Sequence, residues 1–157
     1  MTSSDRGALP SIGGLSVRHP PRLDGAVLEL LRAQNVAILS TLTPRGAIRT
    51  RTVWVDTDGE HVVVNTVADR QWARDLERDA TVTCTVVSRE NPYEFVSIEG
   101  QQVDRTVVGA AEHIDEMARK YLGLDRYPFH DPAQPRVLVR ISAERILHMA
   151  PEAVELD

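Results

Sequence analysis

Arginine side chains with the spacing of a binding site occur between Thr41 and Gly100. Arg49 and Arg51 alternate along a strand-like segment, and Arg70 begins a helix-like one. Two neighbouring arginines repel each other unless water or a shared anion lies between them. Guanidinium groups can grip a phosphate or a carboxylate with two hydrogen bonds at once. The spacing therefore predicts either a solvated outer face or a groove for a flat, anionic molecule.

The start of the expected helix at Arg70 favours the second alternative. Free backbone N–H groups and the helix dipole attract an anion at such a position. Asn65 and Thr66 precede it and supply short hydrogen-bond donors at a strand end. Arg70, Arg74 and Arg78 also share one helical face, which alone is typical of a solvated stripe. We expect a phosphate to be held by Arg70 with Thr66 or Asn65, through charge-assisted hydrogen bonds.

Four of the seven aromatic residues fall in the same region, namely Trp54, Trp72, Tyr93 and Phe95. Trp54 and Phe95 are expected to fill the core. Tyr93 follows Asn91-Pro92 at the junction of a loop and a strand, where an aromatic ring can stack on a planar ligand.

Other kinds of site lack their signatures. The chain has no Gly-x-Gly-x-x-Gly, Walker-type, Gly-x-Ser-x-Gly or Cys-x-x-Cys motif. The five histidines are scattered without the spacing of metal ligands, and no close pair of carboxylates suggests acid–base catalysis. We therefore predict no metal site and assign no catalytic residue.

The composition of the chain excludes some kinds of binding partner. A net charge of -5 argues against a nucleic-acid partner, and no apolar run is long enough to cross a membrane. Of 18 basic residues only Lys120 is a lysine, which either codon bias or the binding of anions explains. The single cysteine, Cys84, is expected in the core and fits a reducing cytoplasm.

The length of 157 residues indicates one domain. We expect a flexible N-terminal arm over residues 1–21, the domain over 22–150 and a tail over 151–157. Hydrophobic periodicity predicts helices over about 23–34, 69–78 and 109–122. Strands are predicted over 36–42, 47–56, 61–66, 81–88, 94–104 and 137–149. Six strands joined mostly by hairpins predict a mainly β fold, a closed or nearly closed antiparallel barrel with few exposed edges.

The order of these motifs resembles the pyridoxamine 5'-phosphate oxidase-like split-barrel flavoproteins. Within them it is most similar to the branch that uses the deazaflavin coenzyme F420. The resemblance covers about residues 23–149 and rests on several short motifs in order: Val53-Trp54, Asn65-Thr66, Arg70-x-x-x-Arg74-x-Leu76, Asn91-Pro92-Tyr93, Ile98-x-Gly100, the segment 113–123 and Pro135-Arg-Val-Leu-Val-Arg-Ile141.

The resemblance implies a six-stranded antiparallel split β-barrel with about three flanking helices, assembled as a homodimer with two cofactor sites between the subunits. It implies that the phosphate lies near Thr66, Arg70 and the position of Trp72, and that Tyr93 comes from the partner subunit. The expected cofactor-binding residues are Arg49, Thr50, Arg51, Thr52, Val53, Asn65, Thr66, Arg70, Gln71, Trp72 and Tyr93. The chain departs from the family pattern at Trp72, where lysine is usual, and at Thr52, where proline is common.

Three functions are compatible with these features. The first is an F420-dependent oxidoreductase that transfers a hydride between the deazaflavin and a small organic substrate. Arginines beyond the phosphate site, such as Arg49 and Arg74, would suit the polyglutamate tail of F420. The second is an oxidoreductase that uses FMN. The third is a non-catalytic binding protein for a flavin-like or tetrapyrrole ligand.

Overall fold

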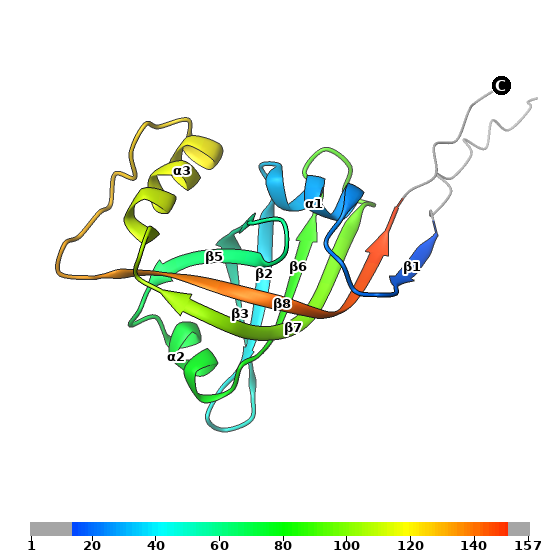
Figure 1. Cartoon of the computed structure of the whole chain (residues 1–157), viewed down its shortest axis with the longest axis horizontal. Helices are drawn as coiled ribbons and strands as arrows, with labels where there is room; N and C mark the ends of the chain where they lie inside the picture. Colours follow the sequence, from blue (N-terminus) through cyan, green and yellow to red (C-terminus); the bar gives the residue numbers. More distant parts are fainter. Residues whose placement is uncertain (1–13, 151–157) are drawn as a thin grey trace, which may run out of the picture.

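A curled antiparallel sheet forms the body of the protein (Figure 1). The computed structural model describes residues 14–150. The strands are β1 (Leu15–Arg18), β2 (Val36–Leu42), β3 (Ile48–Trp54), β4 (Asp56–Thr57), β5 (Val62–Val67), β6 (Thr81–Val87), β7 (Phe95–Thr106) and β8 (Arg136–Met149). The helices are α1 (Gly25–Arg32), α2 (Gln71–Arg78) and α3 (Ala110–Leu122). The predicted mainly β split barrel with three helices is confirmed.

The strand order is β3-β2-β6-β7-β8-β5-β4, with β1 paired to β8. All pairings are antiparallel. The sheet curls so that its two ends, β3 and β5 with β4, come near each other without pairing. The barrel is therefore split along this line, and residues of both ends face the split.

Alternation of side chains along the strands builds the core. Val82, Cys84 and Val86 of β6 are buried, and so are Ala37 and Leu39 of the neighbouring β2. Burial raises the pKa of the Cys84 thiol to about 12, so this residue is the buried core cysteine that the sequence predicts. Helix α1 adds the apolar face formed by Val27, Leu30 and Leu31.

The long hairpin of β7 and β8 bends where its register shifts, between Glu99 and Gly100 and again between Gln102 and Asp104. Such bulges bend a strand and increase its twist. At the first shift a Cβ on Gly100 would lie 2.0 Å from the backbone oxygen of Ser142. Only glycine allows the two strands to approach this closely, so Gly100 helps the sheet to curl.

Most element boundaries differ from the predictions by one or two residues, and two strands, β1 and β4, were not predicted. The strand expected over 47–56 ends at Trp54, and the buried Val55 separates it from the short β4. Leu15–Arg18 form β1 on the edge of β8, within the segment that was expected to be a flexible arm. The rest of that arm, residues 1–13, and the tail over 151–157 lie outside the described residues.

Candidate functional site

An open groove of about 680 Å³ lies at the split of the barrel. This volume is in the range of small-molecule sites. Strand β3 lines one side and β5 the other, while the start of α2, the start of β8 and the loop before β8 complete the walls. The lining residues are Val36, Arg51, Thr52, Val53, Trp54, Asn65, Thr66, Asp69, Arg70, Gln71, Trp72, Ile114, Tyr127 and Arg136.

Most of the residues expected at a cofactor site lie together in this groove. Eight of the eleven line it: Arg51, Thr52, Val53, Asn65, Thr66, Arg70, Gln71 and Trp72. They come from three elements that are separate in the sequence, β3, β5 and the N-terminal part of α2. The structure thus places these residues around one space, while their contacts with a ligand stay a prediction.

Arg49 belongs to a different cluster. Its Nε lies 2.7 Å from a carboxylate oxygen of Asp75, and one terminal nitrogen donates to Gln71 at 2.9 Å. The same carboxylate oxygen accepts a hydrogen bond from the buried Thr41 hydroxyl. Asp75 is 4% exposed, so an unpaired charge there would be costly. Arg49 therefore neutralises a buried carboxylate and does not line the groove.

Thr50 and Tyr93 also lie outside the groove. The hydroxyl of Thr50 is 3.0 Å from that of Ser40, on the outer face of the sheet. Tyr93 is exposed in the loop between β6 and β7. The resemblance assigns Tyr93 to the groove of a second subunit, so its role depends on a dimer.

Trp72 lies between the core and the groove. It is 6% exposed and belongs to the main hydrophobic cluster, and its remaining surface borders the groove. The indole therefore packs against the core at the position where the family pattern usually has lysine. It offers a flat apolar wall to a ligand, but no charge.

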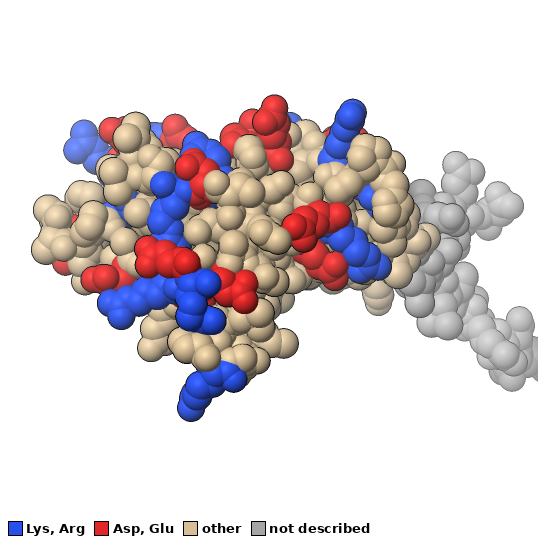
Figure 2. Space-filling view, turned by 60° about the horizontal axis from the view of Figure 1, so that its bottom comes forward, with Lys and Arg blue, Asp and Glu red and all other residues tan. Residues whose placement is uncertain are grey.

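Three arginines of the groove, Arg51, Arg70 and Arg136, form no ion pair within residues 14–150. On the face shown in Figure 2 several clusters of Lys and Arg lie directly beside Asp or Glu, whereas other Lys and Arg side chains there stand alone. Burial lowers the pKa of Arg136, contact with Tyr127 counteracts this, and the nearby charge of Arg70 lowers the pKa further. The groove therefore concentrates positive charge that has no counterion in the described chain.

Aromatic rings form another part of the wall. The ring of Trp54 is parallel to that of Tyr121, with centroids 5.1 Å apart, and meets Tyr127 edge-on at 6.1 Å. Trp54 was expected in the core, and this was wrong, because it lies on the outer side of β3 and is half-buried against α3 and its loop. Such rings offer a planar surface for stacking.

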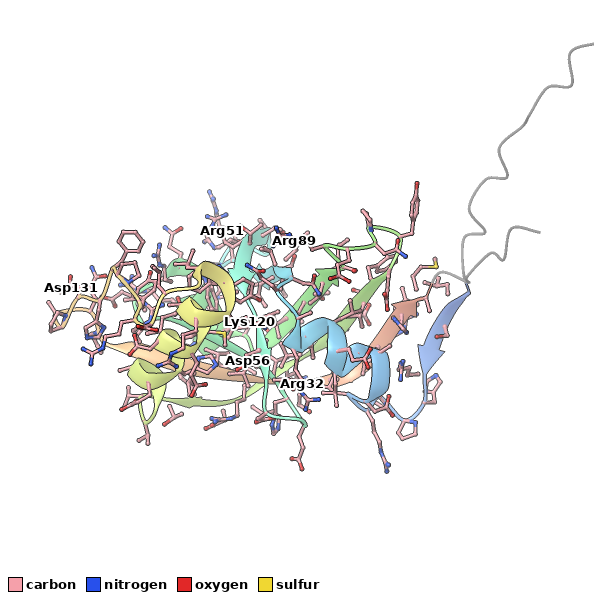
Figure 3. All side chains as sticks on the ribbon, turned by 90° about the horizontal axis from the view of Figure 1, so that it is seen from above. Arg32, Arg51, Asp56, Arg89, Lys120 and Asp131 are labelled. Atoms are coloured by element: carbon pink, nitrogen blue, oxygen red, sulfur yellow. The ribbon has the colours of Figure 1, made fainter. Side chains whose placement is uncertain are left out.

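The base of the aromatic cluster is fixed by α3. Lys120 donates hydrogen bonds to the carbonyl of Leu31 at the end of α1 and to that of Val55. The Tyr121 hydroxyl donates to the carbonyl of Asn35 at 2.6 Å. Burial lowers the pKa of Lys120 to about 8, although the charge of Asp56 opposes this shift. Figure 3 shows Lys120 and Asp56 between α3 and α1.

Sequence reasoning missed several groove residues, above all Arg136 and Tyr127. Tyr127 belongs to the loop between α3 and β8, and Arg136 is the first residue of β8, so both come about 60 residues after the predicted site residues of β3, β5 and α2. The Pro135-Arg136 motif was part of the resemblance, but nothing local in the sequence indicates that it reaches β5. Asp69, also in the groove, is exposed and pairs with Arg74 at 3.3 Å.

Within residues 14–150, no three His, Cys, Asp or Glu side chains are grouped as metal ligands. Among the same residues, no helix has the length and apolarity needed to span a membrane.

Solved structures share this fold. An F420 reductase has 22% sequence identity and a TM-score of 0.66, over 75% of this chain and 93% of that chain. A conserved hypothetical protein from Mycobacterium tuberculosis has 21% identity and a TM-score of 0.61, over 89% and 97%. General Stress Protein 26 from Bacillus anthracis has 15% identity and a TM-score of 0.57, over 82% and 94%.

The similarity to these structures shows the fold alone, because the sequence identities are low. No curated protein matches the chain. A family-level comparison goes further, because the pyridoxamine 5'-phosphate oxidase pattern matches residues 23–150, which include all elements from α1 to β8 and the whole groove. The chain therefore belongs to the pyridoxamine 5'-phosphate oxidase family of flavin-binding split-barrel proteins.

Proposed function

We propose that the protein is an oxidoreductase that binds coenzyme F420 in the groove between β3 and β5 and transfers a hydride between it and a small organic substrate. The observation that carries the proposal is the combination of three arginines without counterions and a wall of aromatic rings around one space. The arginines suit the phosphate and carboxylates of the ligand, and the rings suit its planar part.

The residues of the groove bind and orient, and none acts as an acid or base in the proposal. When bound, the deazaflavin supplies the hydride chemistry. Thr52 and Val53 of β3 form the side on which the ring would lie, while Thr66 and Arg70 would hold the phosphate. The apolar surfaces of Trp54 and Trp72 would exclude water from part of the site.

FMN is the second candidate, because the family takes its name from an oxidase with flavin chemistry. Two features support F420 instead. The groove is lined by three arginines, from β3, the start of α2 and the start of β8, and an F420 reductase is among the similar structures. The first feature suits a ligand with several negative charges.

Parallel fluorescence-quenching titrations with F420 and FMN test the proposal. Tight binding of F420 with weak binding of FMN supports it, and the reverse result favours FMN. The reduced cofactor, mixed with candidate substrates, then tests hydride transfer by the recovery of oxidised deazaflavin absorbance. A protein that binds neither cofactor would contradict the proposal.

A homodimer is the second part of the proposal. The outer face of β3, β2 and β6 carries no charged residue, and Val36, Ile38 and Val87 are exposed there. Ser40, Thr50, Thr52, Thr83 and Thr85 are further outward residues of this face, and Ser97 continues it onto β7 as far as the exposed Glu99, which pairs with Arg145. Depletion of charge is characteristic of the centre of an interface. In such a dimer, the resemblance implies that Tyr93 of one subunit reaches the groove of the other.

Sedimentation velocity checks the dimer. The wild type is expected at twice the mass of the chain, and Ile38→Asp is expected to be monomeric, because the substitution places a charge in the uncharged face. Val103→Asp on β7 is the control, since Val103 is exposed outside this face. A monomeric wild type would contradict the homodimer.

A further inference from the structure

A series of hydrogen bonds runs from the interior to Arg136 in the groove. The Nε of Arg136 donates to Oδ1 of Asn65 at 2.7 Å. The Nδ2 of Asn65 donates to the backbone carbonyl of Ala110 at 2.8 Å and lies 3.2 Å from Nδ1 of His113. The Nε2 of His113 lies 2.9 Å from a carboxylate oxygen of Asp56. Four side chains from β4, α3, β5 and β8 are thus connected.

The ionisation of Asp56 determines which group donates and which accepts in each hydrogen bond of this series. Partial burial raises the pKa of Asp56, but hydrogen bonds from His113 and the Thr57 backbone, with the charges of His113 and Lys120, lower it overall. An ionised carboxylate accepts the Nε2 proton of His113, so Nδ1 is left as an acceptor for the amide of Asn65. The amide oxygen of Asn65 is then directed at Arg136.

The position of Arg136 leaves its charge available. Asn65 engages Nε, so the two terminal nitrogens carry the remaining donors. The ring of Tyr127 lies under the guanidinium, 5.0 Å from its central carbon. Within residues 14–150 no carboxylate pairs with Arg136, and Asp69, the acidic residue of the groove, pairs with Arg74. The side chain is oriented by neutral groups and keeps its full charge.

Arg70 faces the same space from the start of α2 and is also without an ion pair among the described residues. Two guanidinium groups that share a groove repel each other, and an anion between them removes the repulsion. Trp72, at the position where the family pattern has lysine, is packed into the core and contributes no charge.

We propose that Arg136 and Arg70 together clamp the phosphate group of the ligand, that Arg136 takes the place of the cation missing at Trp72, and that Asn65 positions Arg136. The proposal rests on the proposed function in assigning the phosphate to a flavin-type cofactor. Asn65 is thus a positioning residue, and Asp56 and His113 fix the orientation of its amide.

The first experiment compares ligands with and without the phosphate. FMN and riboflavin are titrated by fluorescence into the wild type, Arg136→Gln and Arg145→Gln. F420 and its chromophore, which lacks both the phosphate and the polyglutamate tail, form a second pair that is treated in the same way. We expect Arg136→Gln to weaken the binding of the phosphate-bearing ligand about 10- to 100-fold, the range for a hydrogen bond to a charged group. The dissociation constant of the phosphate-free ligand is expected to change less than about threefold. Equal weakening of both ligands would overturn the clamp.

Arg145→Gln is the matched control. Arg145 lies on the same strand, but its partner is the exposed Glu99, and it does not line the groove. The control is expected to bind every ligand like the wild type. Circular dichroism and the melting temperature are measured for each variant, so that a loss of folding is distinguished from a loss of binding.

A double-mutant cycle tests the role of Asn65. We expect Asn65→Ala to weaken the binding of the phosphate-bearing ligand when it is introduced into the wild type. In the Arg136→Gln background it is expected to cause little further loss of affinity, because Asn65 acts through Arg136. A role in general packing would produce the same loss in both backgrounds, and that result would overturn the positioning of Arg136 by Asn65.

A titration with inorganic pyrophosphate separates this inference from the proposed function. If the wild type binds neither a flavin nor F420, the proposed function fails. The clamp still predicts that pyrophosphate raises the melting temperature of the wild type, and does so less for Arg136→Gln and Arg70→Ala. Equal shifts in the wild type and both variants would overturn the clamp, whatever the cofactor.

Discussion

Two neighbouring regions of the molecule use the same residue type in opposite ways. The cluster around Asp75 contains Arg49, Thr41 and Gln71, and the groove contains Arg51, Arg70 and Arg136. Arg49 and Arg51 are two residues apart on β3 and share one face of the strand. The first is bound to a buried carboxylate, whereas the second has no ion-pair partner within residues 14–150.

The difference shows what makes a cation available for binding. An arginine whose charge is neutralised by a buried partner stabilises the fold, and its removal leaves that partner uncompensated. An arginine held by neutral groups at the wall of a groove adds little to stability and keeps its charge for a ligand. Helix α2 serves both regions, since Asp75 binds Arg49, while Gln71 accepts a hydrogen bond from Arg49 and also lines the groove.

The largest effect is expected from Trp72→Ala. Because the indole is buried in the core, its removal is expected to lower the free energy of unfolding by about 3–5 kcal/mol. Urea denaturation followed by circular dichroism measures this loss. A change below about 1 kcal/mol would show that Trp72 belongs to the groove and not to the core.

Asp75→Ala is expected to follow, with a loss of about 2–3 kcal/mol in the free energy of unfolding. The substitution leaves the Arg49 charge without its partner, although partial exposure of Arg49 reduces the penalty. The double variant Arg49→Met with Asp75→Leu is the control and is expected to regain part of the loss in the same denaturation. If Asp75→Ala is as stable as the wild type, the cluster has no structural role.

Arg70→Ala is expected to act on binding and not on stability. The dissociation constant of the cofactor should rise by the equivalent of about 1.5–3 kcal/mol, as for a hydrogen bond to a charged group. The free energy of unfolding should stay within about 0.5 kcal/mol of the wild type, because the side chain is exposed. Titration and denaturation of the same preparation check both values. Unchanged affinity would remove Arg70 from the site.

The smallest expected change in stability comes from substitution of Asp58, a paired carboxylate that does not line the groove. Partial burial raises its pKa, but hydrogen bonds from the backbone of His61 and Glu60 and from the His61 side chain lower it to about 2 overall. Because the folded pKa lies below the ordinary 3.8, Asp58 stabilises the fold above about pH 4, and the contribution is lost as the pH falls towards 2.

Asp58→Asn should therefore be less stable than the wild type at pH 5, by no more than about 1 kcal/mol at this exposed turn. The two proteins should converge as the pH approaches 2. Melting temperatures between pH 5 and pH 2 measure the difference. A constant difference over this range would show that the carboxylate charge of Asp58 does not contribute.

Local patterns in the sequence were sufficient for most of the fold. The alternation of Val82, Cys84 and Val86 predicted a half-buried strand, and the spacing of Val27, Leu30 and Leu31 predicted a helix. Such periodicities depend only on which side chains must leave water. Strand β1 was missed because it is only four residues long and its pairing with β8 joins distant parts of the chain.

The candidate site was predictable only in part. Residues 51–53 and 65–72 are close in the sequence, and the groove contains most of them, but β3 and β5 do not pair, so the curl of the whole sheet brings them together. Arg136 and Tyr127 reach it through α3 and the loop before β8, which no local pattern encodes. Trp54 was assigned to the core because large aromatic residues are often buried, but its face of β3 is the outer one.

The sequence alone determined which side chains share a strand face, since the period of two residues is a property of the extended backbone. It placed Arg49 and Arg51 on the same face, but it could not show which of them is neutralised. Only the tertiary structure decided this, because Asp75 lies 26 residues further along the chain and reaches Arg49 through the packing of α2 on β2. The availability of a charge depends on its neighbours in space, and those neighbours are set by the fold as a whole.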